Sequence, residues 1–437
     1  EVIYAGALKG IMDSLEDPYS TYLDTTSMRS LNDTTVGNFG GVGLSISKPV
    51  NSTAEKPAYV EVASPIEGGP GYKAGIHAGD LLISINGTPT QDITMDEVLG
   101  MLRGKIGESV DVVVRRGKNM EFPVTLVREL IEVPTVKFGM IDDKNAKIGY
   151  LRIIEFTPQT AQRVQDAIDS FKKNNFTGMI IDLRNNPGGL ITSVADVADK
   201  FIDSGIIVST KSRISEAASV YTATPDATTM PKGIPIVVLI NKGSASASEI
   251  LAGALKDYHL AYLVGERTYG KGSVQQVIPL YNADGVKLTM ARYYTPSDVN
   301  IDKIGIPPDM EVKVPDLTEE QEKSYVELIN KAEIEKYVEE HPNMNEHDIA
   351  VYAKALTYTY KLDEKLLRRL IRIEVERTRD PSLYDLDYDD QLKEAIRIIE
   401  SEDFEKLVKS TKTLKELQEQ ALLEDKSLSK DSKEDKN

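Results

Sequence analysis

The feature that most constrains the fold is a series of short, almost entirely apolar runs separated by stretches with helical periodicity. Residues 178–183, 234–240 and 261–264 are such runs, and each has the length of a strand. Between them the apolar residues recur at helical spacing, for example over 164–171. Strands without a polar face need cover on both sides, which crossover helices provide. We therefore predict a layered α/β core over residues 131–316.

A different pattern precedes this core. Over residues 38–130, short alternating strands are separated by glycine turns, among them Asn86-Gly87, a strong tight-turn signal. A glycine-rich loop runs into the strand at Leu44, and the apolar residues from Met95 to Leu102 have helical spacing. This length and element content predict one small domain.

The two ends of the chain are predicted to be helical. Residues 1–37 begin with a helix that ends before Pro18, because proline disfavours helix in the residue before it. Residues 317–423 are rich in Glu, Lys, Leu and Tyr at helical spacing and should form three to five helices. Residues 424–437 are charged and serine-rich, and we expect them to be disordered. The chain is thus predicted to be a multidomain α+β protein.

Composition excludes several functional classes. Lys and Arg number 52 against 69 Asp and Glu, a net charge of −17 that repels phosphate backbones, so no nucleic acid partner is expected. There is no cysteine, which excludes disulfides, a thiol nucleophile and cysteine-ligated zinc. Of the four histidines, His341 and His347 are spaced two residues too widely for the His-x-x-Glu-His zinc pattern. No metal or cofactor is expected.

One strand-to-helix turn carries candidate chemistry. The run ending at Ile240 is followed by small residues, and a helix begins near Ser246. The Ser246 hydroxyl is thereby placed at a helix N-terminus, beside backbone N–H groups that can stabilise an oxyanion. Ser246 and Glu249 also fit the S-x-x-E capping box, so this segment alone favours a capping role over a nucleophile.

A serine nucleophile needs a base, and no histidine lies in a segment that resembles a site. Lys271 is the alternative, because it lies between Gly270 and Gly272 in a turn after a buried strand. Lysine acts as a base only where burial lowers its pKa from about 10.4. Taken alone, Lys271 is more simply a lysine in a surface turn.

A third segment, Asp182 to Gly189, follows a strand and precedes a helix. Gly188 and Gly189 expose backbone N–H groups there, which suits a second oxyanion donor. An ordinary strand-to-helix turn is the alternative interpretation.

Together these segments resemble the carboxyl-terminal processing proteases, a family of Ser-Lys peptidases with an embedded PDZ domain. The resemblance covers roughly Ala7 to Val314 and implies a crotonase-like protease core over 131–316 and a PDZ domain over 38–130. The stretches that match in family order are Leu15 to Tyr22, Asp182 to Gly189, Gly243 to Glu249, Gly265 to Gln275, Ala291 to Ser297 and Gly305 to Asp309.

The resemblance assigns roles by motif position. It implies that Ser246 is the nucleophile, which overturns the capping preference, that Lys271 is the base, and that Gln275 orients the lysine. The oxyanion hole would use the N–H of Ala247 and that of Gly188 or Gly189, between which the resemblance does not choose.

The sequence departs from the family pattern at one place. Asp298 to Lys303 replaces the usual Gly-Arg and the Gln-Gly-type turn that follows it. This departure affects the expected local substrate contacts and not the dyad.

The small domain would bind a substrate's C-terminal carboxylate. Successive N–H groups in a glycine-rich loop form a cup for an anion, and the strand that follows offers an edge to an added peptide strand. On the opposite wall, Val98 and Leu102 are candidate pocket residues. Arg103 fits the family position implicated in activation, or is a solvated cation at the helix end. The loop consists of Gly40, Gly41, Val42, Gly43 and Leu44.

The implied function is a serine endopeptidase that cleaves proteins near or from their C-termini, with the PDZ domain gating activity. A PDZ-based adaptor without proteolytic activity is the alternative. A crotonase-like enzyme would need a coenzyme A site, for which no feature is seen. The expected substrates are unfolded or tagged protein C-termini.

Further partners and the location are also expectations. Apolar stripes such as Leu366, Leu370 and Ile373 suggest a homodimer or higher homo-oligomer, or an adaptor contact, unless they pack on their own core. No apolar run reaches the ~18 residues of a membrane span. The resemblance suggests an extracytoplasmic location, with a leader or membrane anchor that preceded Glu1.

Overall fold

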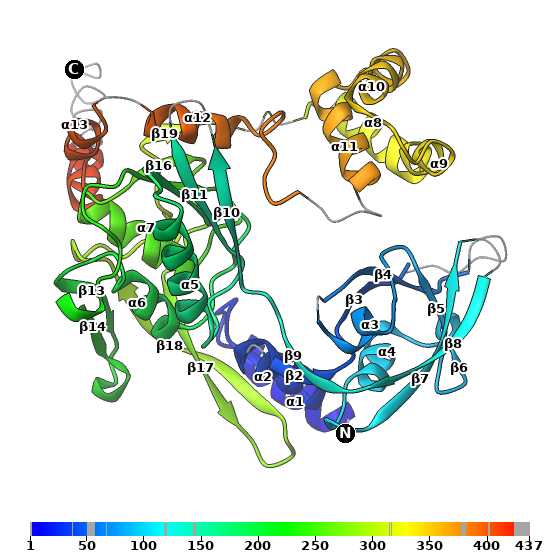
Figure 1. The fold of residues 1–437 in the computed structure, drawn as a ribbon. Coiled ribbons are helices and arrows are strands. Elements are labelled where there is room, and N and C mark those ends of the chain that lie inside the picture. The colour runs from blue at the N-terminus through cyan, green and yellow to red at the C-terminus, as the bar shows by residue number, and fades with distance from the viewer. Residues whose placement is uncertain are drawn as a thin grey trace, which may run out of the picture. The chain divides into compact units, whose positions relative to one another are not determined.

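The computed structural model describes residues 2–36, 38–49, 57–66, 68–117, 120–142, 146–313, 315, 317–376, 382–400 and 403–423 (Figure 1). The tail 424–437, for which disorder is expected, lies outside the described residues. The chain divides into two compact units. The first, here the core unit, combines residues 1–37, 134–313 and 389–437, and the second unit combines residues 38–133 and 314–388.

The core unit is built on a six-stranded sheet. All neighbouring strands in it are parallel except the edge pair β10–β11, which is antiparallel. The apolar runs that predicted buried strands at 178–183, 234–240 and 261–264 are its central strands. In spatial order the sheet contains β10 (Val136–Asp142), β11 (Lys147–Ile153), β12 (Gly178–Asp182), β15 (Ile236–Ile240), β16 (Tyr262–Gly265) and β19 (Met310–Glu311).

Helices cover both faces of this sheet. On one face, the ring of Phe171 in α5 (Thr160–Lys173) packs directly against Gly149 of β11. It occupies the space that a side chain at position 149 would need. On the other, Ile399 of α12 (Asp390–Ile399) packs against Gly178. Gly178 pairs with the neighbour of Gly149, and side chains alternate along a strand, so the two glycines face opposite sides.

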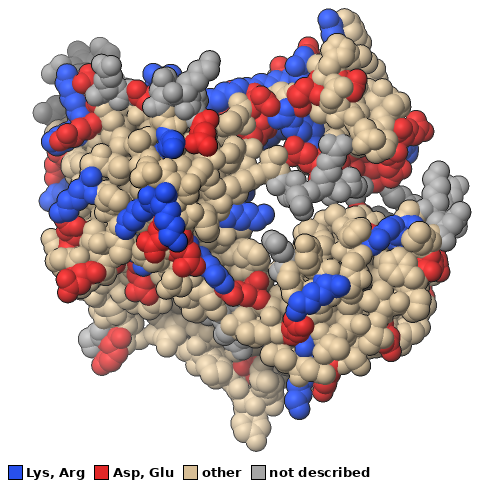
Figure 2. Space-filling view, in the orientation of Figure 1, with Lys and Arg blue, Asp and Glu red and all other residues tan. Residues whose placement is uncertain are grey.

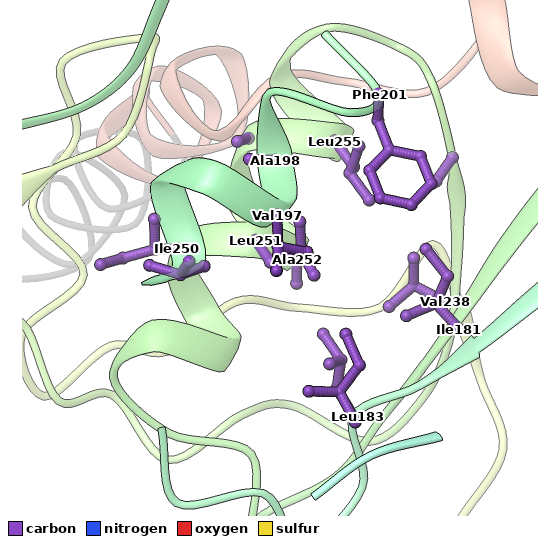
Figure 3. Close-up of a cluster of buried hydrophobic side chains, with 14 of the residues drawn as sticks. Ile181, Leu183, Val197, Ala198, Phe201, Val238, Ile250, Leu251, Ala252 and Leu255 are labelled. Atoms are coloured by element: carbon purple, nitrogen blue, oxygen red, sulfur yellow. The ribbon is translucent and has the colours of Figure 1, made fainter. Parts of the chain in front are cut away.

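Two further helices, α6 (Ile191–Ala198) and α7 (Ala247–Asp257), complete the α5 face. Figure 3 shows their apolar side chains, such as Val197 and Leu251, meeting Ile181 and Val238 of the central strands. The sequence prediction of a layered α/β core is confirmed.

The core unit also contains a second sheet that the sequence analysis did not predict. In this sheet, β17, which begins two residues after Lys271, pairs with β18. Strand β1 of the N-terminal segment also pairs with β18. Its strands are only partly buried, so their apolar pattern is weak. The strands are β1 (Thr21–Leu23), β13 (Gly205–Lys211), β14 (Ser219–Ala223), β17 (Ser273–Pro279) and β18 (Gly285–Tyr294), and the flanking helices are α1 (Val2–Asp13) and α2 (Thr25–Val36).

The C-terminal region, expected as one helical region over 317–423, is divided between the units. Residues from Asp389 onward return to the core unit, where α12 packs on β12, β15 and β16 and is followed by α13 (Phe404–Lys409). Leu414 is buried in the core cluster. The return follows from the apolar face of α12, which covers a sheet face that would otherwise meet water.

The remaining helices, in the second unit, have an apolar core of their own. Leu367 and Ile371 are buried in it, Leu366 and Leu370 are partly buried against it, and Ile373 is exposed. Packing on its own core, one of the two interpretations of this stripe, therefore accounts for Leu366 and Leu370. The helices are α8 (Glu319–Asn330), α9 (Glu333–Glu340), α10 (Glu346–Tyr360) and α11 (Glu364–Glu376).

The other part of the second unit is a small β domain. Val60, Leu82 and Val98 belong to its apolar core. Strand β3 lies at the edge of its main sheet, and a separate ribbon pairs β2 with β9. The elements are β2 (Asn38–Gly41), β3 (Leu44–Ser47), β4 (Val60–Pro65), α3 (Pro70–Lys73), β5 (Leu81–Ile85), β6 (Thr88–Pro89), α4 (Met95–Leu102), β7 (Ser109–Arg116), β8 (Met120–Val127) and β9 (Glu129–Glu132).

Acidic and basic side chains are interspersed on the face drawn in Figure 2. Among the residues that the structure describes, no helix is both long and apolar enough to span a bilayer.

A buried ion pair anchors α7 to the core. The ammonium group of Lys256, 1% exposed, bonds to the carboxylate of Asp309. Asp309 also accepts a hydrogen bond of 2.9 Å from the N–H of Leu263 at the edge of β16. A buried charge is tolerated only when it is paired, so each partner depends on the other.

Asp309→Ala should therefore lower the free energy of unfolding by about 3–5 kcal/mol, because it leaves the Lys256 ammonium buried without a counter-charge. The combined variant Lys256→Met, Asp309→Leu should cost clearly less. Urea denaturation followed by circular dichroism measures both. Equal losses in the single and the combined variant would show that packing, and not charge, explains the effect.

Candidate active site

The candidate nucleophile lies at a strained turn. Strand β15 ends at Ile240, and Ser246 occupies the N-cap position of α7 with φ 54° and ψ −114°. A positive φ in a residue other than glycine costs on the order of 1–3 kcal/mol and persists only where the surroundings fix it. The turn is fixed by Ser244, whose hydroxyl donates 2.8 Å to the carbonyl of Leu183.

Glu249 fixes the turn from inside the protein. Its carboxylate is fully buried and accepts 2.9 Å from the N–H of Ser246, as a capping box requires. The same carboxylate accepts from the N–H of Gly270 at 2.7 Å, from the N–H of Lys271 at 2.9 Å, and from the hydroxyl of Thr268 at 2.5 Å. Glu249 therefore links the turn of Ser246 to the turn of Lys271.

Tyr293 makes a second link between the same two turns. Its buried hydroxyl lies 3.3 Å from the carbonyl oxygen of Ser246 and also bonds to the carbonyl of Lys271. Burial raises the pKa of Tyr293 well above its ordinary value, so the hydroxyl stays protonated and can donate. The sequence analysis did not find this residue, although Tyr293 lies in one of the stretches that match the family.

The side chain of Lys271 is partly buried. Its Nζ lies 5.1 Å from the centre of the Tyr19 ring, which belongs to the N-terminal segment. Burial lowers the pKa of Lys271, the positive charge of Lys287 lowers it further, and the negative charge of Glu249 opposes both. This is the direction that a lysine base needs.

The segment that departs from the family pattern packs on both glycines beside Lys271. The N–H of Lys303 donates 2.8 Å to the carbonyl of Gly270. Asn300 Nδ2 donates 3.2 Å to the carbonyl of Gly272, whose N–H donates to Asp302. The segment 298–303 thus supports the lysine turn, a contact that the sequence analysis did not predict.

Gln275 lies on β17, four residues after Lys271. Its Nε2 donates 2.9 Å to the hydroxyl of Ser273 and 3.3 Å to the hydroxyl of Thr289 on β18. These bonds fix the side-chain amide beside the lysine turn.

The loop after β12 adjoins the nucleophile. A Cβ on Gly188 would lie 2.8 Å from the Cβ of Ser246, so only glycine fits there. Asn186 is buried and ties this loop to the Ser246 turn, because its carbonyl accepts from the N–H of Ala245 and from the hydroxyl of Ser248. Its side chain accepts 2.8 Å from the N–H of Gly188.

The candidate oxyanion donors therefore differ in availability. The N–H of Gly188 is already bonded to Asn186, whereas Gly189 is exposed. Within the part of the chain that the structure describes, the N–H groups of Gly189 and Ala247 have no hydrogen-bond acceptor.

The candidate peptide-binding loop of the small domain connects β2 to β3. The N–H of Gly104 donates 3.0 Å to the carbonyl of Gly40, and a Cβ on Gly40 would overlap the carbonyl of Gly104. Gly43 has φ 67°, which glycine adopts without strain. Gly41 and Val42 are buried beside it. Leu44 begins the edge strand β3, partly buried.

Of the other candidate residues in this domain, Val98 and Leu102 lie on α4 and are buried in the domain's own core. Arg103 follows α4, and its guanidinium group stacks 4.3 Å from the centre of the Phe39 ring at the start of the loop. Arg103 is therefore held against the loop and is not merely a solvated cation at a helix end.

Comparisons with known proteins agree with this architecture. The model described as peptidase family S41 matches residues 147–312, and a PDZ-domain model matches residues 61–116. The carboxy-terminal-processing protease of Bartonella bacilliformis is 38% identical over 76% of this chain and 74% of its own length. The carboxyl-terminal-processing peptidase 2, chloroplastic, of Arabidopsis thaliana is 37% identical over 69% and 59%, and the carboxy-terminal processing protease CtpA of Bacillus subtilis is 36% identical over 71% and 64%.

The chain thus spans less than two thirds of the last two relatives and about three quarters of the first. The matches confirm the resemblance that the motifs indicated, and with it the protease core and the PDZ domain. The chain belongs to the carboxyl-terminal processing proteases of peptidase family S41 and is a serine-type peptidase that acts on proteins.

Proposed function

We propose that the chain is an endopeptidase that cleaves proteins near or from their C-termini with a Ser246–Lys271 dyad. The observation that carries the proposal is the double link between the two turns. One oxygen of Glu249 accepts from the N–H groups of both Ser246 and Lys271, and the Tyr293 hydroxyl reaches both carbonyl oxygens. A nucleophile and its base need such a fixed separation.

The proposed mechanism follows from the two side chains. Neutral Lys271 takes the proton of the Ser246 hydroxyl, whose oxygen attacks the peptide carbonyl carbon. The lysine then gives that proton to the leaving amine. Water, activated by the same lysine, hydrolyses the acyl-enzyme. Gln275 orients the amine of Lys271 throughout.

The N–H groups of Ala247 and Gly189 are the proposed oxyanion donors. Both lack an intramolecular acceptor among the described residues, and Ala247 begins a helix, where the dipole favours negative charge. Gly188 would first have to release the side chain of Asn186. We therefore favour Gly189 over Gly188, whose closeness to Ser246 serves packing.

Replacing either dyad residue should abolish cleavage. Ser246→Ala and Lys271→Ala should each lower kcat for an unstructured protein such as casein at least about a thousandfold, the scale of losing a nucleophile or its base. Thr26→Ala, on the exposed face of α2, is the matched control and should cleave normally. A folded Lys271→Ala variant with near-normal kcat would exclude the dyad. An inert wild type would favour the alternative, a PDZ-based adaptor.

The pH dependence tests the base separately. Only neutral Lys271 accepts a proton, so kcat/KM should rise with pH to a plateau, with a midpoint below the ordinary lysine pKa of about 10.4. Lys287→Met removes a charge that lowers the Lys271 pKa, and should move the midpoint upward. Lys303→Met is the control. A midpoint that Lys287→Met leaves in place would contradict this electrostatic account.

The PDZ domain is proposed to capture the substrate's terminal carboxylate and to gate cleavage. The loop 40–44 would bind the carboxylate through its N–H groups, and the free edge of β3 would pair with the substrate strand. Val98 and Leu102, which are buried in the domain's own core, would lie beneath the proposed pocket. Arg103, which stacks on Phe39 at the loop, would respond to an occupied groove.

A peptide with a free apolar C-terminus should bind at least about tenfold more tightly than the same peptide with an amidated C-terminus, because one charge-assisted contact is lost. Fluorescence polarisation measures both affinities on the Ser246→Ala variant, which cannot cleave the peptide. Equal affinities would rule out carboxylate capture.

Deleting residues 40–125 should change activity or tail selectivity without unfolding the core unit.

Self-association or an adaptor contact through the helices of the second unit stays a prediction, for which the exposed Ile373 is the remaining support. Light scattering that finds a monomer at micromolar concentration would exclude the homodimer. The extracytoplasmic location and membrane association through a preceding segment rest on the family resemblance alone.

A further inference from the structure

The N-terminal turn from Asp17 to Ser20 is bonded to the segment that carries Gln275. The hydroxyl of Thr289, on β18, donates 2.6 Å to Asp17 Oδ2. The hydroxyl of Ser20 donates 2.5 Å to the same oxygen and accepts 3.1 Å from the N–H of Thr289. Two residues near the start of the chain thereby hold Thr289, more than 250 positions later, which pairs with Gln275 across β17 and β18.

The polarity of this network, meaning which group donates and which accepts in each hydrogen bond, is determined by the charge state of Asp17. An ionised carboxylate only accepts hydrogen bonds. Burial alone would raise the pKa of Asp17, but the bonds from Ser20 and Thr289 outweigh it and lower the pKa, so Asp17 is ionised. The Thr289 hydroxyl has one proton, which it gives to Asp17. Its oxygen must then accept from Gln275, which can only present its NH₂ group, 3.3 Å away.

This polarity fixes which way the Gln275 amide points. With Nε2 directed at Thr289 and Ser273, Oε1 is the atom of the amide that is left to act as an acceptor. In the proposed mechanism it accepts from the amine of Lys271. An acceptor there holds the N–H bonds of the neutral amine on one side and leaves the lone pair for the Ser246 proton. The reversed amide would donate to the lone pair and block the base.

Tyr19, in the same turn, lies against Lys271 itself. Its ring centre is 5.1 Å from Lys271 Nζ, and burial together with a bond to Tyr269 raises the pKa of Tyr19 to about 12, so the ring stays neutral. The charged groups that act on Lys271 from other elements are Glu249 of α7 and Lys287 of β18.

We infer that the turn Asp17–Ser20 is a positioning element of the active site, which sets the orientation of Gln275 through Thr289 and thereby directs the amine of Lys271. The inference rests on the proposed Ser-Lys mechanism. It gives Asp17, Ser20 and Thr289 positioning roles and no contact with substrate.

The decisive comparison is Thr289→Val against Thr289→Ser, since neither changes a charge. Thr289→Val removes both the donor to Asp17 and the acceptor of Gln275, and should lower kcat about tenfold with KM unchanged, at the low end of what a general base contributes. Thr289→Ser keeps the hydroxyl and should retain most of the activity. Asp17→Asn, which can reverse the polarity of the network, should behave like Thr289→Val.

Asp284→Asn is the matched control. This buried carboxylate also ties the N-terminal segment to the hairpin of β17 and β18, through the Tyr22 hydroxyl at 2.8 Å, but it does not lead to Gln275. If Asp284→Asn lowers kcat as much as Asp17→Asn, the effect is loss of docking and the inference is wrong.

The pKa of Lys271 gives a readout that needs no turnover. Competitive acetylation with acetic anhydride at a series of pH values, read by mass spectrometry, measures it in the full chain. An oriented acceptor stabilises the ammonium form, so its loss in Thr289→Val should lower the Lys271 pKa. Simple loosening admits water and raises the pKa instead.

The possible results distinguish failure of the positioning role of the turn Asp17–Ser20 from failure of the proposed Ser-Lys mechanism. A lower Lys271 pKa in Thr289→Val, restored in Thr289→Ser, supports the inference even if the resting enzyme is inert. An unchanged or raised pKa overturns it. Normal cleavage by a folded Lys271→Ala variant would instead remove the proposed mechanism, on which the inference depends.

Discussion

The site depends on one buried carboxylate. Glu249 accepts from two turns that are more than twenty residues apart, and its four donors are all backbone N–H groups or a hydroxyl. Burial raises its pKa, and the four hydrogen bonds counter that rise by stabilising the charged form. Its negative charge opposes the lowering of the Lys271 pKa. Glu249 thus fixes the separation of Ser246 and Lys271 at the expense of a higher Lys271 pKa. The separation matters more, since a base with a suitable pKa at the wrong distance cannot take the proton.

The opposite face of the sheet supports the loop of Asn186 to Gly189, with its proposed oxyanion donor, in a comparable way. Arg184, two residues after β12, forms paired bonds with Asp182 and with Asp389 at the start of α12. Gln391 of the same helix donates 2.8 Å to the carbonyl of Val312, just before the chain leaves the core unit. The return of the C-terminal region is therefore bonded to the strand end that carries the loop of Asn186 and Gly188.

What the sequence predicted, and what it did not, follows from the range of the interactions. The apolar run at 178–183 and the small residues before Ser246 encode local structure, and both were found. Glu249 was identified only as a capping partner, because its bonds to Gly270 and Lys271 join segments that no local pattern connects. Tyr293 and Thr289 both lie on β18, a partly buried strand with weak periodicity. The residues of α12 gave no signal that this helix would return to the sheet.

The inferred role of the turn Asp17–Ser20 also depends on an interaction between segments that are remote in sequence. A lysine base lacks the fixed tautomer of histidine, and its amine rotates freely about the last bond of a flexible chain. Orientation must then come from neighbours whose own hydrogen bonds have a single polarity. An ionised carboxylate at the end of such a network supplies that polarity, because it can only accept. In the proposed mechanism, Asp17 would therefore serve catalysis without meeting the substrate.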